Sequence, residues 1–269
     1  MNADIGIIGG TGFYRFFSDS TDRTVATPFG ETSAPLSLAT VSGRSVAFIP
    51  RHGRCHEHLP SEVPYRANLW AMRSLGVRQV IAFNTVGSLQ QHIRRGDFVL
   101  ANQFVDRTSG RPDTIFHGPD GAHISSAEPY CETMRAAATA ALSRMQESFH
   151  PEGTVVVIQG PRFSTRAESR WFTQMNWDIV NMTQYPEVAI ARELELCYMN
   201  LSYVTDYDVA AKEIASADPC APVSHALVLK EFSLNESRIE RVVNALVAAM
   251  PDSGACTCRS ALDGARVGR

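Results

Sequence analysis

The sequence predicts an α/β fold in which a mostly parallel or mixed β-sheet is flanked by helices. Short runs of branched apolar residues alternate along the chain with longer segments whose apolar residues recur at helical spacing. Hydrophobic residues make up 44% and charged residues 20% of the 269 positions, as in an ordinary globular protein. No internal repeat or low-complexity linker divides the chain, so one domain over residues 1–269 is the simplest account.

Strand-like and helix-like segments follow each other from one end of the chain to the other. Strands are expected over residues 4–10, in a hairpin at 36–53, and over 77–89, 96–106, 153–163, 177–183 and 197–208. Helices are expected over residues 66–76, 129–145, 165–175, 186–196 and 233–250. The hairpin is expected to turn at Ser42 and Gly43, and the first helix to stop at Gly76.

Charge and hydropathy exclude several classes of protein. The formal net charge is -3 and the chain contains no basic run, so we expect no nucleic-acid partner. No apolar stretch approaches the ~20 residues that span a bilayer, and the N-terminus lacks the pattern of a signal peptide. We therefore expect a cytoplasmic protein without a membrane partner.

The cysteines are consistent with a reducing compartment. They are Cys55, Cys131, Cys197, Cys220, Cys256 and Cys258. The first four are scattered singly, as reduced thiols are. The C-x-C pair in the tail, about residues 251–269, supplies two ligands where a structural zinc site needs four, so no metal site is expected. Two tail thiols and a tail disulfide both remain open.

The stretch IGIIGGTGFY, residues 5–14, predicts a strand that ends in a glycine-rich loop. A dinucleotide fingerprint would need a third glycine where Arg15 stands, and a P-loop would need a lysine after Gly12. Converging backbone N–H groups and the hydroxyl of Thr11 suit a single oxyanion such as orthophosphate. A plain tight turn is the alternative.

Three further strand ends carry groups that can bind phosphate. They supply Arg51 and His52, then Asn84 and Thr85, and finally Met182 and Thr183. Carboxyl ends of neighbouring strands meet at one edge of a sheet, where α/β proteins bind their ligands. A solvated basic turn is the alternative for the segment around Arg51, and metal binding by His56 and His58 lacks acidic or thiolate partners.

The last strand and the loop at 160–169 offer groups for a purine. Asp206 and Asp208 are two residues apart, so on an extended chain they face the same side. Two adjacent carboxylates raise each other's pKa, which favours proton donation to a leaving base. Phe163 could stack on that base, with Ser164 beside it. Solvated turn aspartates and core packing of Phe163 are the alternatives.

Loop 106–128 is long and polar. Loops of this length are more often functional or interfacial than filler, although disorder is the alternative.

Taken together, the motifs IGIIGGTG, PRHGRCH, YRANLWA, VGSL, GPRFSTRAES, NMTQYPEVAIARE and TDYD resemble the 5'-methylthioadenosine phosphorylases. These belong to the trimeric purine nucleoside phosphorylase family, and the resemblance covers about residues 4–250, with the C-x-C tail similar to that of microbial members. It implies a single α/β domain with a mixed, partly barrel-like central sheet. It also implies a homotrimer with active sites near the subunit interfaces; pairing of trimers into hexamers is left open.

The resemblance implies roles for named residues. Phosphate would be held by Thr11, Arg51, His52, Asn84, Thr85 and Thr183. Base and sugar would be surrounded by Phe163, Ser164, Met182, Asp206 and Asp208, and a neighbouring subunit would lend His123 to the 5' side of the sugar. The implied reaction is phosphorolysis of 5'-methylthioadenosine to adenine and a pentose 1-phosphate, with orthophosphate as co-substrate and no cofactor or metal.

The sequence departs from the family pattern at points that concern substrate choice. Asn84-Thr85 stands where many members have Thr-Ala, and Pro64 replaces the usual asparagine. His225 falls where an apolar residue usually lines the 5'-methylthio pocket, so a polar 5' group is an alternative, as is a surface histidine. 5'-Methylthioinosine, adenosine and another 5'-modified nucleoside are alternative substrates. A non-catalytic nucleoside binder is a rival from another class, whereas an NAD-dependent oxidoreductase lacks its glycine fingerprint.

Overall fold

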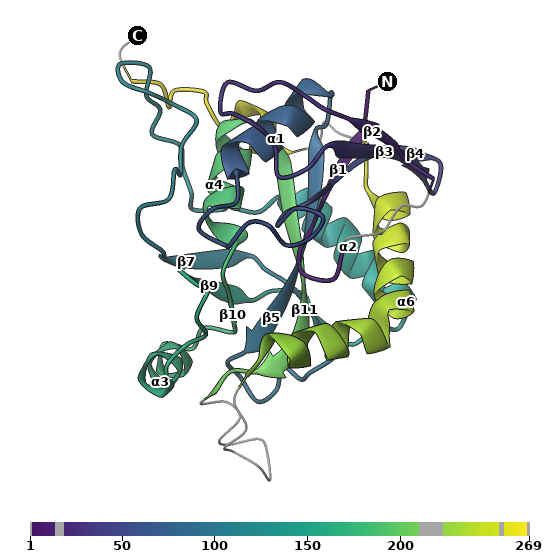
Figure 1. Cartoon of the computed structure of the whole chain (residues 1–269), viewed down its shortest axis with the longest axis vertical. Helices are drawn as coiled ribbons and strands as arrows, with labels where there is room; N and C mark the ends of the chain where they lie inside the picture. Colours follow the sequence, from purple (N-terminus) through teal and green to yellow (C-terminus); the bar gives the residue numbers. More distant parts are fainter. Residues whose placement is uncertain (1, 14–18, 210–222, 253–255, 268–269) are drawn as a thin grey trace.

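The computed structural model describes residues 2–13, 19–209, 223–252 and 256–267, and within them the strands form one mixed sheet (Figure 1). The strands are β1 (Ile5–Gly9), β2 (Thr21–Arg23), β3 (Leu36–Val41), β4 (Arg44–Pro50), β5 (Gln79–Ser88), β6 (Phe98–Leu100), β7 (Gln103–Arg107), β8 (Phe149–His150), β9 (Thr154–Ile158), β10 (Ile179–Asn181) and β11 (Cys197–Tyr207). The main path runs β2-β3-β4-β1-β5-β10-β9-β7. The α/β class is thus confirmed.

The sheet branches at β5, because this strand has three neighbours. β1 pairs with its first residues, β10 pairs antiparallel with its last two, and β11 follows it in parallel over its whole length. β6 and β8 continue the branch beyond β11. Since β1, β4, β5 and β11 are mutually parallel, their carboxyl ends lie at one edge of the sheet.

Helices cover both faces of the sheet (Figure 1). On one face α1 (Tyr65–Ser74) contacts α4 (Gln184–Glu193), and on the other α2 (Glu132–Arg144) contacts α6 (His225–Ala249). Each pair packs on its own cluster of buried apolar side chains, in which residues such as Leu69 and Val188 on one side and Met134 and Val243 on the other are fully covered. α3 (Arg166–Gln174) begins with a capping box formed by Thr165 and Glu168.

The predicted turns agree with the structure, whereas several predicted bounds differ, such as those of the strand expected over 153–163, which ends at Ile158 as β9. Ser42 and Gly43 both have positive φ, 49° and 78°, as a two-residue hairpin turn requires. The expected single strand over 96–106 is two strands, β6 and β7, which pair with different partners. α6 begins at His225 rather than near residue 233, because Ser224 caps it by accepting a hydrogen bond from the Leu227 N–H.

Two short strands, β2 and β8, were not predicted from the sequence. The short strands β2 and β8 have three and two residues, too few for a period-2 pattern to be recognised. Cys220 and most of the poorly matching segment after Asp208 lie outside the described residues. Across the described part of the chain, no helix has the length and apolar character that crossing a membrane requires.

Candidate active site

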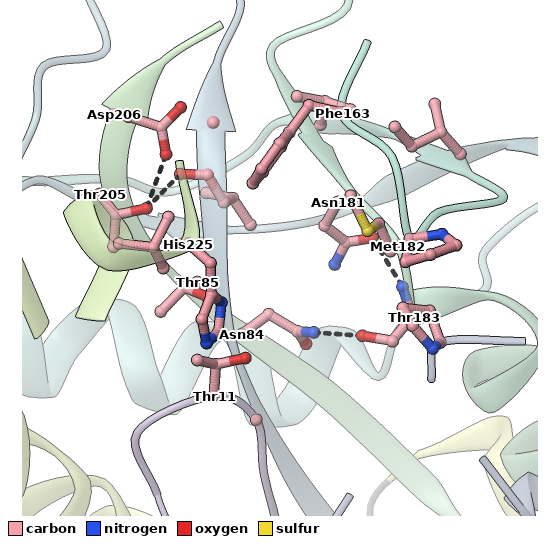
Figure 2. Close-up of a pocket in the computed structure, with 18 of the residues that line it drawn as sticks. Thr11, Asn84, Thr85, Phe163, Asn181, Met182, Thr183, Thr205, Asp206 and His225 are labelled. Atoms are coloured by element: carbon pink, nitrogen blue, oxygen red, sulfur yellow. Dashed lines mark hydrogen bonds between the residues drawn. The ribbon is translucent and has the colours of Figure 1, made fainter. Parts of the chain in front are cut away.

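A cavity of about 360 Å³ opens where the carboxyl ends of β1, β4, β5 and β11 meet β10 (Figure 2). Its size is in the usual range of small-molecule pockets. The predicted residues that line it are Thr11, Arg51, His52, Asn84, Thr85, Phe163, Ser164, Met182, Thr183, Asp206, Asp208 and His225. Thr11 and Thr183 lie toward one end in Figure 2, and Asp206 and Phe163 toward the other. His123 is the predicted residue that does not line this cavity.

The glycine loop after β1 leaves no room for side chains. A Cβ at Gly10 would lie 3.0 Å from Nη1 of Arg51 and 3.1 Å from the carbonyl oxygen of Phe83. Gly12 has a φ of +93°, and a Cβ there would lie 2.4 Å from the ring of Phe232 on α6. The loop is therefore glycine-rich because the backbone approaches its neighbours closely and turns through a conformation that other residues avoid.

Hydroxyl groups dominate the end of the cavity next to this loop. β10 is antiparallel to β5, so the chain after it runs back beside β5, and Thr183 comes level with Asn84. Nδ2 of Asn84 donates to Oγ1 of Thr183 at 2.7 Å, which leaves the Thr183 hydroxyl hydrogen to donate elsewhere. Within the described residues, the hydroxyls of Thr11 and Thr85 have no hydrogen-bond partner, so three threonine donors are available to an anion at this end.

Arg51 is held beneath these donors by an ion pair with Glu187. Its Nε and Nη2 donate to the two carboxylate oxygens of Glu187 at 2.7 and 2.9 Å, and Nη1 donates to the carbonyl of Phe83 at 3.0 Å. Nη2 also donates to Oδ1 of Asn84 at 3.4 Å. One Nη1 hydrogen is left without a partner among the residues described. Burial alone would lower the pKa of Arg51, but the Glu187 carboxylate raises it, so the guanidinium stays charged.

His52 beside it is neutral. Burial, together with the charge of Arg51, lowers the pKa of His52 to about 3. Its Nδ1 lies 2.9 Å from the carbonyl oxygen of His58, which assigns the proton to Nδ1. Nε2 is then an acceptor, so the ring cannot donate a hydrogen bond to phosphate from Nε2.

The acidic end of the cavity is built on an irregularity in β11. Pairing with β5 shifts between Val204 and Asp206, which leaves Thr205 as an extra residue. The hydroxyl of Thr205 donates to Oδ2 of Asp206 at 2.8 Å, nearer than the carbonyl of Val86 at 3.3 Å. A Cβ at Gly87 would lie 3.2 Å from Oδ1 of Asp206, so glycine leaves space for this carboxylate.

Asp208 follows β11 and faces the same cavity, as its spacing from Asp206 predicted. Burial raises the pKa of Asp208 above its usual range, while the nearby Ser169 hydroxyl acts in the opposite direction. Oδ2 of Asp208 and Oγ of Ser164 are buried, and neither has a hydrogen-bond partner within the described part of the chain. A carboxyl group of this kind holds a proton more readily than an exposed one and can exchange it with a ligand.

Phe163 lies across the cavity from Asp206 and is 37% exposed (Figure 2). A partly exposed ring at a cavity mouth can cover a planar ligand. Deeper in, Oδ1 of Asn181 accepts from the backbone N–H groups of Thr183 and Gln184 at 3.3 and 3.4 Å. Its Nδ2 is buried without a partner in the described residues, so it is a donor available to a ligand.

Histidines form a third wall. The rings of His52 and His56 are stacked with centroids 4.6 Å apart, and His56 meets His225 edge to face at 5.5 Å. Burial, reinforced by His225, lowers the pKa of His56. The rings of His52 and His56 therefore favour the neutral form in this part of the cavity.

Loop 106–128 is fastened to the strand ends around the cavity by Arg111. Its guanidinium is buried and donates to the carbonyls of Met182, Tyr185, Gln159 and Ile158 at 2.7 to 3.4 Å. His123 is exposed and lines a separate hollow with Tyr185 and Glu193.

Four residues that contribute to the site were not predicted from the sequence. They are Arg111, Asn181, Thr205 and Glu187. Glu187 could have been recognised from the sequence, because an acidic residue on the buried face of a helix needs a buried cation. Asn181 could also have been recognised, because it directly precedes two residues already assigned to the site.

Comparison with known proteins identifies the family of this chain and its relatives. A family model described as the phosphorylase superfamily matches residues 4–248, and the chain belongs to this superfamily. The purine nucleoside phosphorylase of Streptomyces coelicolor is 48% identical over 274 residues, which cover 98% of this chain and 96% of the relative. The S-methyl-5'-thioadenosine phosphorylase of Mycolicibacterium smegmatis is 50% identical over 254 residues, which cover 94% of this chain and 93% of the relative.

Solved structures agree. The methylthioadenosine phosphorylase from Schistosoma mansoni in complex with adenine superposes with a TM-score of 0.90 at 34% identity, over 98% of this chain and 99% of the other. A methylthioadenosine phosphorylase from an antarctic soil metagenomic library superposes with a TM-score of 0.89 at 36% identity, over 100% of this chain and 93% of the other. The fold is therefore the nucleoside phosphorylase fold.

Proposed function

We propose that this protein is a nucleoside phosphorylase whose preferred substrate is 5'-methylthioadenosine. One observation carries the proposal: a single cavity combines threonine hydroxyls and a glycine loop at one end with an aromatic ring and two carboxyl groups at the other. Relatives named S-methyl-5'-thioadenosine phosphorylase at 43–50% identity support the choice of substrate.

The reaction divides between the two ends. Orthophosphate sits against Thr11, Thr85 and Thr183, over the positive charge of Arg51. One phosphate oxygen forms a bond to C1' while the bond from C1' to N9 breaks, and the electron pair passes to the purine. The transition state has oxocarbenium character, and the phosphate anion beneath the sugar stabilises it electrostatically.

The carboxyl pair acts on the leaving base. Asp208, whose pKa is raised by burial, holds or passes a proton that neutralises the purine as it leaves. Asp206, fixed by Thr205, accepts from the exocyclic amine of adenine. Phe163 covers the base, and Nδ2 of Asn181 donates to a sugar hydroxyl. His52 contributes the acceptor Nε2 or its backbone to the site, because its Nδ1 already donates to the carbonyl of His58.

A second candidate differs only at the 5' position. His56 and His225 supply hydrogen-bonding groups where a methylthio group needs apolar contact, and one relative at 48% identity is named purine nucleoside phosphorylase. This favours adenosine, with its 5'-hydroxyl, as the alternative substrate. His225→Val would then raise the ratio of kcat/KM for methylthioadenosine over adenosine about tenfold, the worth of one hydrogen bond of ~1.4 kcal/mol. The exposed His92 gives a control, His92→Val, that should leave the ratio unchanged.

We propose that the working unit is a homotrimer, in which His123 completes a neighbour's site. The exposure of His123 outside its own cavity supports this. Co-expressing His123→Ala and Asp206→Asn chains tests it. Mixed trimers regain activity if the residue acts across an interface, and a mixture no more active than the two single variants contradicts the proposal.

The activity is tested with a nucleoside panel varied at the 5' and 6 positions, with and without phosphate. We expect phosphate-dependent release of adenine and formation of a pentose 1-phosphate from methylthioadenosine. Absence of release from methylthioadenosine, adenosine and every 5'-deoxy analogue would contradict the proposal; ligand binding without turnover would identify the protein as a nucleoside binder.

A further inference from the structure

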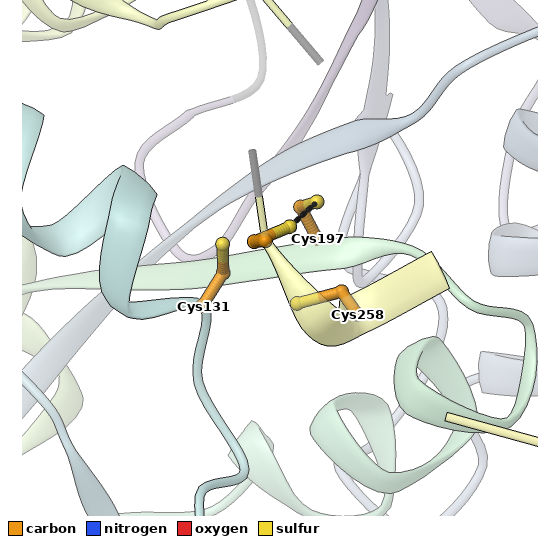
Figure 3. A group of neighbouring side chains, drawn as sticks. Cys131, Cys197 and Cys258 are labelled. Atoms are coloured by element: carbon orange, nitrogen blue, oxygen red, sulfur yellow. Dashed lines mark hydrogen bonds between the residues drawn. The ribbon is translucent and has the colours of Figure 1, made fainter. Parts of the chain in front are cut away.

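Four cysteine side chains converge where β11 begins, at the opposite end of this strand from Asp206 and the cavity. Figure 3 shows Cys131, Cys197 and Cys258 in this group. The sulfur atoms of Cys131, Cys197, Cys256 and Cys258 all lie within 4.8 Å of one another. Cys131 precedes α2, Cys197 is the first residue of β11, and the other two come from the C-terminal tail at the 3-10 helix η1 (Thr257–Ser260). The tail C-x-C pair therefore meets two cysteines that are distant in the sequence.

The cluster is held by rigid elements and shielded from solvent. Cys131, Cys197 and Cys258 are buried within the core beneath α2 and α6, and Cys256 packs against the same core. The backbone N–H of Cys131 donates to the carbonyl of Tyr198 at 2.7 Å, and that of Cys197 donates to Arg78 at 2.9 Å. All four are free thiols in this structure. The sequence shows only the two tail ligands as a pair, because spacing alone does not reveal that the fold supplies two more.

We propose that Cys131, Cys197, Cys256 and Cys258 form a tetrathiolate site for one zinc ion. Tetrahedral zinc with sulfur at ~2.3 Å places its ligands ~3.8 Å apart, within the span of this cluster. The sulfurs of Cys197 and Cys256 are 3.2 Å apart, so small side-chain rotations suffice to reach that spacing. Binding releases thiol protons and changes no oxidation state.

The ligand set defines a structural rather than a catalytic role. Four protein sulfurs close the coordination sphere and leave no open position for substrate. Asp206 lies nine residues beyond Cys197 on β11, about 30 Å along the strand, so the proposal does not depend on the proposed function.

A metal here would fasten the C-terminal tail to the body of the protein. After η1 the tail pairs with the loop at 117–123. The backbone N–H of Val267 donates to the carbonyl of Gly121 at 2.9 Å, and the backbone N–H of His123 donates to the carbonyl of Ala265 at 2.8 Å. The site would thus join α2, β11 and the tail that borders this loop.

Cobalt(II) is the probe for the test. The full chain is reduced with a phosphine, desalted without oxygen and titrated with cobalt chloride. We expect thiolate-to-cobalt charge transfer and the visible bands of tetrahedral cobalt to saturate at one ion per chain, and one equivalent of zinc to abolish them. Cys256→Ser and Cys258→Ser should each lose this saturable signal, while Cys55→Ser, which removes an exposed cysteine outside the cluster, should keep it.

A second measurement on the unmodified chain guards against variants that fail to fold. Zinc should protect Cys131, Cys197, Cys256 and Cys258 from alkylation, mapped by peptide mass, and leave Cys55 reactive. The proposal is overturned if the reduced chain takes up no cobalt, if zinc protects none of the four, or if the cluster proves to be a pair of disulfides whose reduction confers no metal uptake.

Discussion

Asp206→Asn is the substitution that tests the acidic end of the cavity most sharply. In the structure the Thr205 hydroxyl donates to Oδ2 of Asp206, and Oδ1 lies next to Gly87 at the cavity wall. In the asparagine variant the same hydroxyl selects the amide oxygen as its acceptor. The amide NH2 then faces the base, so an acceptor is replaced by a donor at constant shape.

The expected size of the effect follows from this exchange. Adenine's exocyclic amine loses a charge-assisted hydrogen bond, worth ~1.5–3 kcal/mol, and meets a donor that leaves both groups unsatisfied. Together these cost about 3–5 kcal/mol, or a fall in kcat/KM of about 10²–10⁴ for adenine nucleosides. A 6-oxopurine nucleoside presents an acceptor at the same place. The fall in its kcat/KM should therefore be at least about tenfold smaller than the fall for adenine nucleosides.

The assay compares kcat/KM for methylthioadenosine and methylthioinosine in the wild type and the variant, at saturating phosphate. Equal losses for both substrates would refute the assignment of Asp206 to the 6 position of the base. A fall below twofold for methylthioadenosine would remove the residue from the catalytic site altogether.

Three further predictions concern the phosphate end. Gly12→Ala should raise the KM for phosphate and should destabilise the protein by more than Gly30→Ala does. Gly30 is the control because it has a similar φ of +92° but no atom within 4 Å of the new Cβ. Equal unfolding free energies for the two variants would show that the contact at Gly12 does not matter. Glu187→Gln strands the buried charge of Arg51 and should lower the urea-derived unfolding free energy by ~3–5 kcal/mol, against little change for the exposed Glu240→Gln. The pKa of His52 is lowered in the folded state, so its contribution to stability is complete above its unfolded pKa of 6.5 and is lost as pH falls toward about 3. Thermal unfolding from pH 7 to 4 should therefore show a smaller loss in His52→Asn than in the wild type, and parallel curves would contradict this.

Sequence reasoning reached the fold because its signals are local. Strand runs, the Ser42-Gly43 turn and the glycine stop at Gly76 each depend on a few neighbouring residues, and the structure has them where they were expected. The failures have the same origin. Whether 96–106 forms one strand or two depends on pairing partners far along the chain, which no local pattern records.

The cavity lining was predictable for a related reason. Residues at the carboxyl ends of parallel strands must share an edge, so Thr11, Arg51 and Asp206 could be grouped before their contacts were known. What each group donates or accepts could not be predicted. The engagement of Arg51 by Glu187 and the tautomer of His52 depend on tertiary partners, and so does the meeting of four cysteines at the start of β11.

The central claim is that one cavity binds orthophosphate beneath the sugar and a purine against the two acids. A crystal structure with adenine and phosphate tests it most directly. We expect phosphate on the hydroxyls of Thr11, Thr85 and Thr183, and adenine between Phe163 and the carboxyl groups of Asp206 and Asp208. Phosphate bound outside this cavity, or adenine that does not contact either acid, would contradict the claim.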